Sequence, residues 1–223
     1  PGTNFNNDTN NLSNNILCIW LEVNNSQMML SNSKKPTIIC GSSCVDIYTG
    51  KCYIQRFTNE YLHNPATFDE LEKFISIYNP CETLIIHNFQ DENKVNDVIN
   101  YVNIQSTKIH KIKTDTEKVI KCEKQTYQKE IIEQFYQEKD KENIYIDLSR
   151  YDIATQSLCY LLNFLYESNP DLISKIHEPK YETAGSEQLI TANHSLKQLN
   201  IIEDNNYKGK LSSIVTFLNN AIT

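Results

Sequence analysis

The order of the apolar segments along the chain limits its fold more than any other feature. Three strand-like runs come first, at Ile16–Val23, Thr37–Ile47 and Cys52–Phe57. The polar turn Tyr48–Lys51 joins the second run to the third and predicts an antiparallel hairpin. Strand-like and helical periodicities then alternate, with strands predicted at Thr83–His87 and Ser106–Lys113 and helices at Thr67–Tyr78, Val95–Val102, Thr126–Tyr136 and Ser149–Tyr166. This order predicts an α/β domain built on one mixed sheet.

The element order is also that of a ribonuclease H-like domain, in which three antiparallel strands precede alternating helices and strands. Thr67 and Glu70 have the spacing of a capping box and predict the start of the first helix. The run Ser106–Lys113 alternates loosely, which is typical of an edge strand whose lysines face water. The predicted fold class is therefore α/β and ribonuclease H-like, followed by a short helical unit.

Composition divides the chain into four parts. Residues 1–15 are Asn- and Thr-rich with almost nothing to bury, and predict a disordered linker or an expression remnant. Residues 16–177 form the predicted α/β domain, and the polar stretch 178–187, with Pro179 and Gly185, predicts a linker. Residues 188–223 read as a short strand and two amphipathic helices, the start of a second, truncated domain.

Composition also limits the setting of the protein. No apolar run approaches the roughly 18 residues of a membrane span, and no signal peptide opens the chain. Seven cysteines, an odd number without secretory features, indicate reduced thiols and an intracellular protein, without separating nucleus, mitochondrion and virus factory or virion. The net charge of −7 makes the chain by itself a poor ligand for nucleic acid, because phosphate contacts need clustered Lys and Arg.

One segment is locally basic, and we call its six lysines the basic stretch: Lys108, Lys111, Lys113, Lys118, Lys121 and Lys124. Their functional interpretation is a contact patch for phosphates or for a partner protein. The simpler interpretation, which we favour, is the solvated face of an edge strand and of the helix that follows it.

Carboxylates need a separate test, because a ribonuclease H-like domain is a nuclease when several acids converge on paired metal ions about 4 Å apart. The acids near the expected positions are Glu22, Glu70, Glu72 and Asp46, and His87–Asn88 ends the fourth strand. We expect Glu70 and Glu72 on a solvated helix face and Asp46 as a ligand of its own turn. The pattern favours structural acids over a catalytic centre.

The spacing of the cysteines likewise argues against a zinc site. Structural zinc is usually bound by paired cysteines on tight loops. Cys40 and Cys44 instead have the even spacing of one strand face, so we predict that they, with Cys52, are small buried hydrophobes rather than zinc ligands with His63. Trp20 in the first strand is predicted to lie in the core.

Gly41, Val45, Asp46, Thr49 and Gly50 have the spacing G-x-x-x-[hydrophobic]-D-x-x-T-G. This is one of five separate patches in which the chain resembles the MutS-type DNA mismatch-repair family, whose connector domain carries such a pattern. The pattern has a physical basis, because Asp and Thr side chains fasten hairpin turns and Gly takes a positive φ.

The other patches lie further along the chain. Asn79–Ile85 is similar to the family's entry to the next strand, and Ile176–Pro179 to the exit from the connector's last helix. The first pattern of the family's core, or lever, domain is matched by Leu189, Ser195, Leu199 and Ile201, with Ala192 and Asn200 in place of two acids. The second is matched by Ser213, Ile214, Leu218, Asn219, Ala221 and Thr223.

The resemblance implies a connector domain plus the start of the lever domain of an ATP-driven clamp. The full-length protein would bind mismatched DNA, use ATP and Mg²⁺, form a homodimer and dock a MutL-like partner. No G-x-x-x-x-G-K-[ST] motif occurs in this chain, because neither Gly50–Cys52 nor Gly209–Leu211 completes it. The resemblance is compatible with a large-virus or an octocoral-mitochondrial branch.

We therefore predict a non-catalytic piece, with no catalytic, cofactor-binding or metal-binding residue of its own, that links the mismatch-binding domain to the levers and the ATPase. Two alternatives stay open. One is a stand-alone ribonuclease H-like, metal-dependent nuclease, and the other is an α/β protein-interaction domain.

Overall fold

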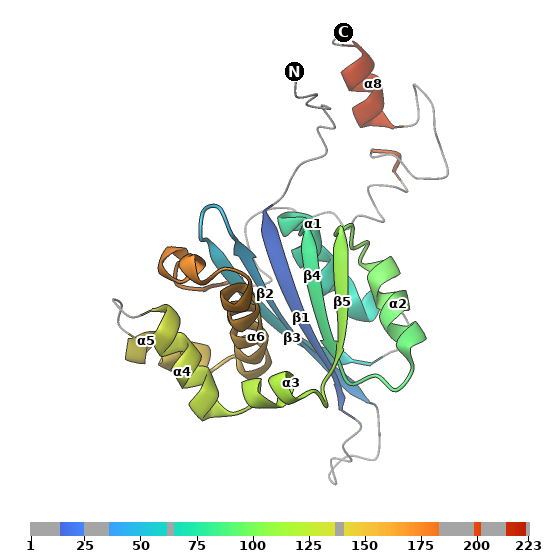
Figure 1. Ribbon diagram of the computed structural model, residues 1–223. Helices are drawn as coiled ribbons and strands as arrows, with labels where there is room; N and C mark the ends of the chain where they lie inside the picture. Colours follow the sequence, from blue (N-terminus) through green and yellow to red (C-terminus); the bar gives the residue numbers. More distant parts are fainter. Residues whose placement is uncertain are drawn as a thin grey trace, which may run out of the picture.

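The computed structural model describes residues 14–24, 36–61, 65–136, 141–182, 199–201 and 213–221. Within these residues the chain forms a six-stranded sheet with helices on both faces (Figure 1). The predicted α/β class is therefore confirmed. The strands are β1 (Asn15–Asn24), β2 (Thr37–Asp46), β3 (Cys52–Glu60), β4 (Glu82–His87), β5 (Lys108–Lys113) and β6 (Lys180–Tyr181).

The strands lie across the sheet in the order β5-β4-β1-β2-β3-β6. β1, β2 and β3 are antiparallel neighbours, which confirms the predicted hairpin. β4 runs parallel to β1, and β5 runs parallel to β4 at the edge of the sheet, where the lysine-rich strand was expected. β6 adds two residues parallel to β3 at the opposite edge.

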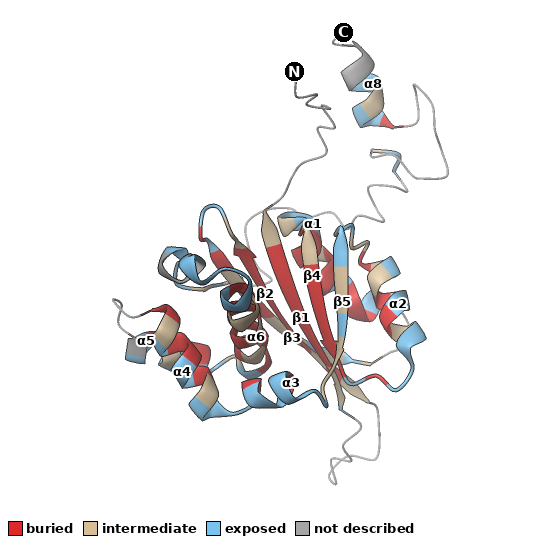
Figure 2. Cartoon of the chain, in the orientation of Figure 1, coloured by how far each residue is buried: buried red, intermediate tan, exposed pale blue. Residues whose placement is uncertain are grey.

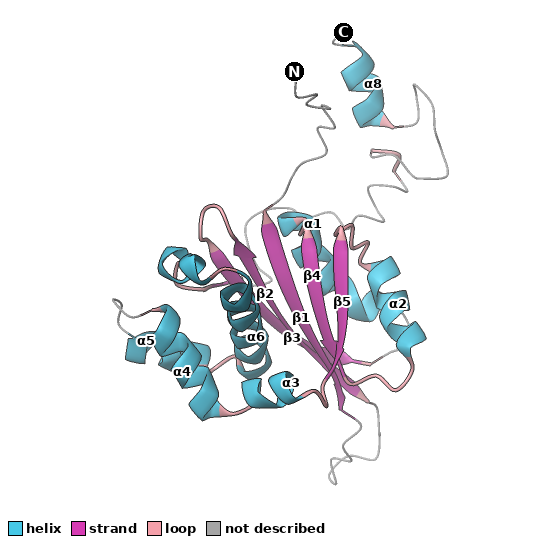
Figure 3. Ribbon diagram, viewed as in Figure 1, coloured by secondary structure: helices cyan, strands magenta, loops and turns pink. Residues whose placement is uncertain are grey.

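Helices α1 to α6 form two layers, one on each face of the sheet (Figure 3). The α6 layer contains α3, α4, α5 and α6, and the α1–α2 layer covers the other face. The bounds are α1 (Asp69–Tyr78), α2 (Glu92–Tyr101), α3 (Glu117–Cys122), α4 (Gln125–Phe135), α5 (Lys141–Leu148), α6 (Asp152–Ser168) and α8 (Ile214–Ala221), with 3₁₀ turns η1 (Pro65–Phe68) and η2 (Pro170–Lys175).

β1 is the centre of the core because helices cover both of its faces (Figure 2). Cys18 and Trp20 pack into the α6 layer, and Leu17, Ile19 and Leu21 pack into the α1–α2 layer. All five are at most 1% exposed, and burying a large apolar side chain contributes roughly 1.5–3 kcal/mol. The predicted core position of Trp20 is confirmed.

The start of α1 differs from the prediction. The capping box is wrong, because Phe68 is the N-cap residue and makes no side-chain cap, while the Thr67 hydroxyl donates instead to Glu60 O at 3.5 Å. The expected solvated position of Glu72 is also wrong, since its side chain is 3% exposed. Glu72 lies four residues after Phe68 and three before Ile75, and so belongs to the buried stripe of the helix.

Three elements were missing from the prediction. α3 has six residues and buries only Val119 and Cys122, too few for a periodic signal. The apolar residues of α5 lie around the whole helix rather than along one stripe. β6 falls inside the range predicted as a linker, residues 178–187.

The structure describes only part of the C-terminal segment, residues 188–223, for which elements were predicted. The short strand and the first of the two helices expected in 188–223 fall on residues outside the described ranges, except for 199–201. α8 is present where the last amphipathic helix was expected, and its exposed side chains include Ile214, Val215 and Leu218. Its assignment to a lever domain stays a prediction. In the described ranges, none of the helices has the length and apolar character that crossing a membrane would require.

Candidate functional site

The turn between β2 and β3 is fastened by one carboxylate. Asp46 Oδ1 accepts hydrogen bonds from the backbone N–H groups of Tyr48 (2.9 Å) and Thr49 (3.2 Å), and Oδ2 accepts one from the Thr49 hydroxyl (2.7 Å). Partial burial alone would raise the pKa of Asp46, but these hydrogen bonds and the Lys51 charge bring it below its ordinary value. Gly50 follows with a φ of 73°. The predicted turn roles of Asp46, Thr49 and Gly50 are confirmed.

The same turn holds residues Ile176–Glu182, which follow η2 and which we call the exit segment. The His177 N–H donates to Gly50 O at 2.7 Å, and the Tyr136 hydroxyl donates to His177 O at 3.2 Å. A Cβ on Gly50 would lie 1.9 Å from Lys175 O, so only glycine lets the two backbones come this close. The turn and Tyr136, the C-cap residue of α4, thus together hold the beginning of the exit segment.

Its end, which contains β6, is held by β3 and by the start of α6. Tyr181 stacks on Tyr151 with ring centroids 3.9 Å apart and an interplanar angle of 12°. The Tyr181 hydroxyl donates to Arg56 O at 3.2 Å, and Arg56 Nε donates to Asp152 Oδ1 at 3.0 Å. The Glu182 N–H donates to Ile54 O at 2.9 Å.

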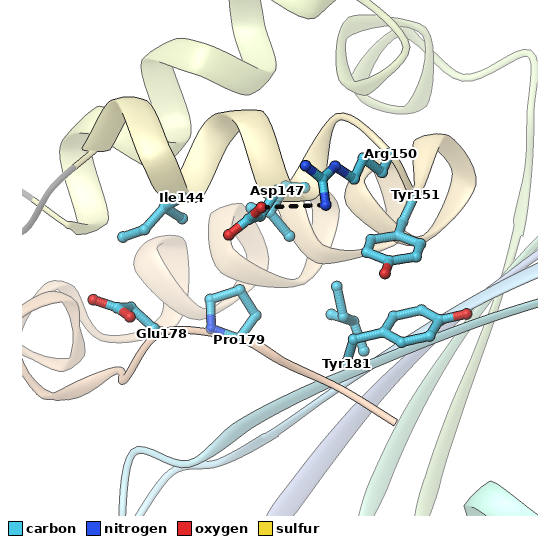
Figure 4. A pocket seen from close by; sticks show the side chains of 9 residues that line it. Ile144, Asp147, Arg150, Tyr151, Glu178, Pro179 and Tyr181 are labelled. Carbon is cyan, nitrogen blue, oxygen red and sulfur yellow. Dashed lines mark ion pairs between the residues drawn. The ribbon is translucent and has the colours of Figure 1, made fainter. Parts of the chain in front are cut away.

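A pocket of about 250 Å³ opens between the exit segment and the corner where α5 meets α6 (Figure 4). Its buried lining is Ile54, Ile144 and Leu148. Its other lining residues are Asp147, Arg150, Tyr151, Glu178, Pro179 and Tyr181. Asp147 Oδ1 and Arg150 Nη1 are 3.8 Å apart, and both side chains are largely exposed.

The basic stretch is divided among β5, α3 and the residue before α4. On β5, Lys111 Nζ donates to Asn96 Oδ1 at 2.5 Å and Lys113 Nζ donates to Phe89 O at 2.8 Å. Lys108 begins β5, and Lys124 is the N-cap of α4.

The two lysines on α3 form ion pairs. Lys118 Nζ lies 2.7 Å from Glu167 Oε2 on α6, and Lys121 Nζ lies 2.8 Å from Glu117 Oε1. Four of the six lysines therefore already have a partner inside this chain.

The acids do not come together. In the β1–β2 register Glu22 is opposite Ile39, whereas Asp46 is opposite Asn15. Ile39 and Asp46 are seven residues apart on β2, so about 23 Å separates the two acids at ~3.3 Å per residue. Glu22 accepts a hydrogen bond from Trp20 Nε1 at 2.7 Å. Across the described ranges, no three His, Cys, Asp or Glu side chains lie close enough to hold a metal ion.

The sheet separates the cysteines of the considered zinc site. Cys40 and Cys44 are buried in the α1–α2 layer, and Cys52 is buried in the α6 layer. Burial raises the pKa of Cys40 and of Cys52 to about 12, so both thiols stay protonated. Their prediction as buried hydrophobes is confirmed, and His63 lies outside the described residues.

Most residues that hold the exit segment carry no signal in the sequence. Tyr181 and Arg56 are 125 positions apart, and Arg56 and Asp152 are 96 apart. β6 has only two residues, too few to show a period. Of the residues that hold the exit segment, only Gly50 could be identified from the sequence, through its turn pattern.

Two comparisons relate this arrangement to known proteins. A family model described as MutS domain II matches residues 16–176, which contain β1 to β5, α6 and the β2–β3 turn. A protein of Acanthamoeba polyphaga mimivirus, named "Putative DNA mismatch repair protein mutS homolog", is 25% identical over 211 residues. That match covers 85% of this chain and 19% of the viral protein, so the chain spans about a fifth of its relative's length. Because the family model covers well over half of the chain, the chain belongs to the MutS domain II family and contains a MutS-type connector domain.

Proposed function

We propose that this chain is the mechanical connector of a MutS-like DNA mismatch-repair protein and has no catalytic centre of its own. Membership of the MutS domain II family supports the connector role, and the name of the viral relative supports mismatch repair. The observation that carries the proposal is the fastening of the exit segment by Gly50, Tyr136 and the Tyr151–Tyr181 stack. A connector transmits a displacement only if its last segment moves with its sheet.

The proposal includes a ribonuclease H-like fold without nuclease activity. The strand order β5-β4-β1-β2-β3, with only β2 antiparallel to its neighbours, supports that fold. The distance between Asp46 and Glu22 argues against the alternative of a metal-dependent nuclease, because two-metal hydrolysis needs acids around ions about 4 Å apart.

The proposal extends to the full-length protein. It would bind mismatched DNA, form a homodimer, dock a MutL-like partner through the connector, and use ATP and Mg²⁺ in a P-loop domain outside these residues. α8 would begin the lever domain. The setting would be intracellular, in keeping with the seven cysteines of the sequence, all of which are unpaired in the structure.

Tyr181→Ala in the full-length protein tests the mechanical role. We expect DNA affinity and basal ATPase activity to stay within about twofold, while the change in ATPase rate on adding mismatched DNA falls by about 2–30-fold, since residues along a coupling route change coupling by ~0.5–2 kcal/mol. The measurement is steady-state ATP hydrolysis with matched and mismatched duplexes.

Tyr48→Ala is the matched control, because that tyrosine is 82% exposed at the tip of the β2–β3 turn. It should leave the mismatch response unchanged. A Tyr181→Ala protein that responds to mismatches like the wild type would contradict the mechanical role.

The basic stretch gives a second test. If its β5 lysines form a solvated edge, Lys111→Glu with Lys113→Glu leaves the DNA affinity of the full-length protein and its salt dependence unchanged. This is the expected result, since both lysines already have partners. If they bind phosphates, affinity falls and the log–log salt slope becomes shallower by about 2, near 0.9 per contact. Titrations at several salt concentrations, with Lys129→Glu on α4 as control, decide between the two.

A further inference from the structure

The pocket beside the exit segment is smaller than a typical site for a drug-sized ligand. Its volume is about 250 Å³, whereas drug-sized ligands occupy sites of roughly 300–1,000 Å³. Ile54, Ile144 and Leu148 line it and are 2%, 7% and 3% exposed. These side chains offer an apolar surface to a long aliphatic stem.

The charged groups around the pocket favour a cation. Asp147 and Glu178 lie on opposite sides of it, one on α5 and one on the exit segment (Figure 4). Arg150 is the one basic lining residue, and it already lies 3.8 Å from Asp147. Within the described part of the chain, Glu178 forms no ion pair. The lining therefore keeps one negative charge without a counter-ion.

The remaining wall is aromatic. Tyr151 and Tyr181 are stacked 3.9 Å apart and both line the pocket, with Pro179 beside them. Aromatic side chains favour a guanidinium over an ammonium, because the guanidinium is planar, weakly hydrated and able to fork toward a carboxylate. An apolar base, an aromatic wall and carboxylates at the rim together match the stem and the head of arginine.

We propose that this pocket receives an arginine side chain from a basic segment of a partner polypeptide. Charge complementarity with Glu178 and Asp147 is the argument for the occupant. Because Asp147 and Arg150 at the rim are exposed, a partner backbone can pass over the mouth while one side chain enters. This site stands apart from the mismatch-repair role, since it rests only on the lining of the pocket.

The test is methyl NMR of this chain with the blocked tripeptide acetyl-Gly-Arg-Gly-amide as the probe. We expect saturable shifts of the Ile54, Ile144 and Leu148 methyl signals, with a Kd on the order of 1 mM. The citrulline tripeptide, which has the same shape without the charge, should bind at least about fivefold more weakly. Glu178→Gln and Asp147→Asn should each weaken binding about two- to fivefold, as expected for exposed ion pairs.

Asp171→Asn is the matched control, an exposed acid on η2 that does not line the pocket, and it should leave the Kd unchanged. Equal binding of the citrulline peptide would overturn the proposal. The absence of methyl shifts at about 10 mM peptide, or shifts that Asp171→Asn weakens as much as Glu178→Gln, would overturn it too.

Discussion

Gly50→Ala is expected to lower the free energy of unfolding by about 2–5 kcal/mol, the sum of two costs. An L-residue in the left-handed region costs roughly 1–2 kcal/mol, and φ at Gly50 is 73°. The added Cβ would also lie 1.9 Å from Lys175 O, and overpacking of this kind typically costs ~1–3 kcal/mol. The measurement is urea unfolding followed by the fluorescence of Trp20, the single and fully buried tryptophan.

One further variant separates these two costs, and a second serves as a reference. Asparagine tolerates a positive φ, so Gly50→Asn keeps the clash with Lys175 O while reducing the backbone strain. Thr49→Ala removes the hydroxyl that donates to Asp46 Oδ2 at 2.7 Å and accepts a long hydrogen bond from the Lys51 N–H at 3.4 Å. It should cost only about 0.5–1.5 kcal/mol. If Gly50→Ala were no more destabilising than Thr49→Ala, the close contact between the turn and η2 would not exist in solution.

Strands β1, β2 and β3 could be predicted because the residues that determine them lie close together in the sequence. Each run of apolar residues in β1, β2 and β3 is long enough to show its period, and Asp46, Thr49 and Gly50 mark the turn that sets the β2–β3 register. Burial of β1 on both faces follows from its nearly continuous apolar run.

The contacts of the exit segment could not be predicted, because they join residues that are distant in the sequence. Nothing near Tyr181 indicates that it will stack on Tyr151, and nothing near Gly50 indicates that Lys175 will lie against it. The capping box failed for a similar reason, since Thr67 had an alternative partner in Glu60, at the end of β3. A local sequence pattern indicates which hydrogen bonds a residue can make. Tertiary packing then decides which of them form.

Gly41 allows the beginning of α6 to pack closely against the β2–β3 hairpin. It lies in β2, between Trp20 of β1 and Arg56 of β3. A Cβ at this position would meet Ile153 C at 2.4 Å and Ala154 N at 2.5 Å. The first turn of α6 can rest on the sheet only because a glycine lies beneath it. The two glycines of the family pattern are thus the points where β2 and its turn touch the beginning of α6 and the end of η2.

Gly41→Ala should therefore lower the free energy of unfolding by about 1–3 kcal/mol, the usual cost of overpacking. Without the clash, Gly41→Ala would raise the free energy of unfolding by ~0.4–1 kcal/mol, because it reduces the conformational entropy of the unfolded chain. The sign of the measured change therefore already distinguishes the two cases. Urea unfolding again measures the change.

Ala154→Gly provides the decisive control for Gly41. It removes a side chain next to the contact but leaves the main-chain atoms that a Cβ at position 41 would meet. The double variant should consequently recover none of the stability lost in Gly41→Ala, beyond the effect of Ala154→Gly alone. Recovery would mean that side chains, not backbones, set the spacing between α6 and the sheet, and that the glycine pattern needs another explanation.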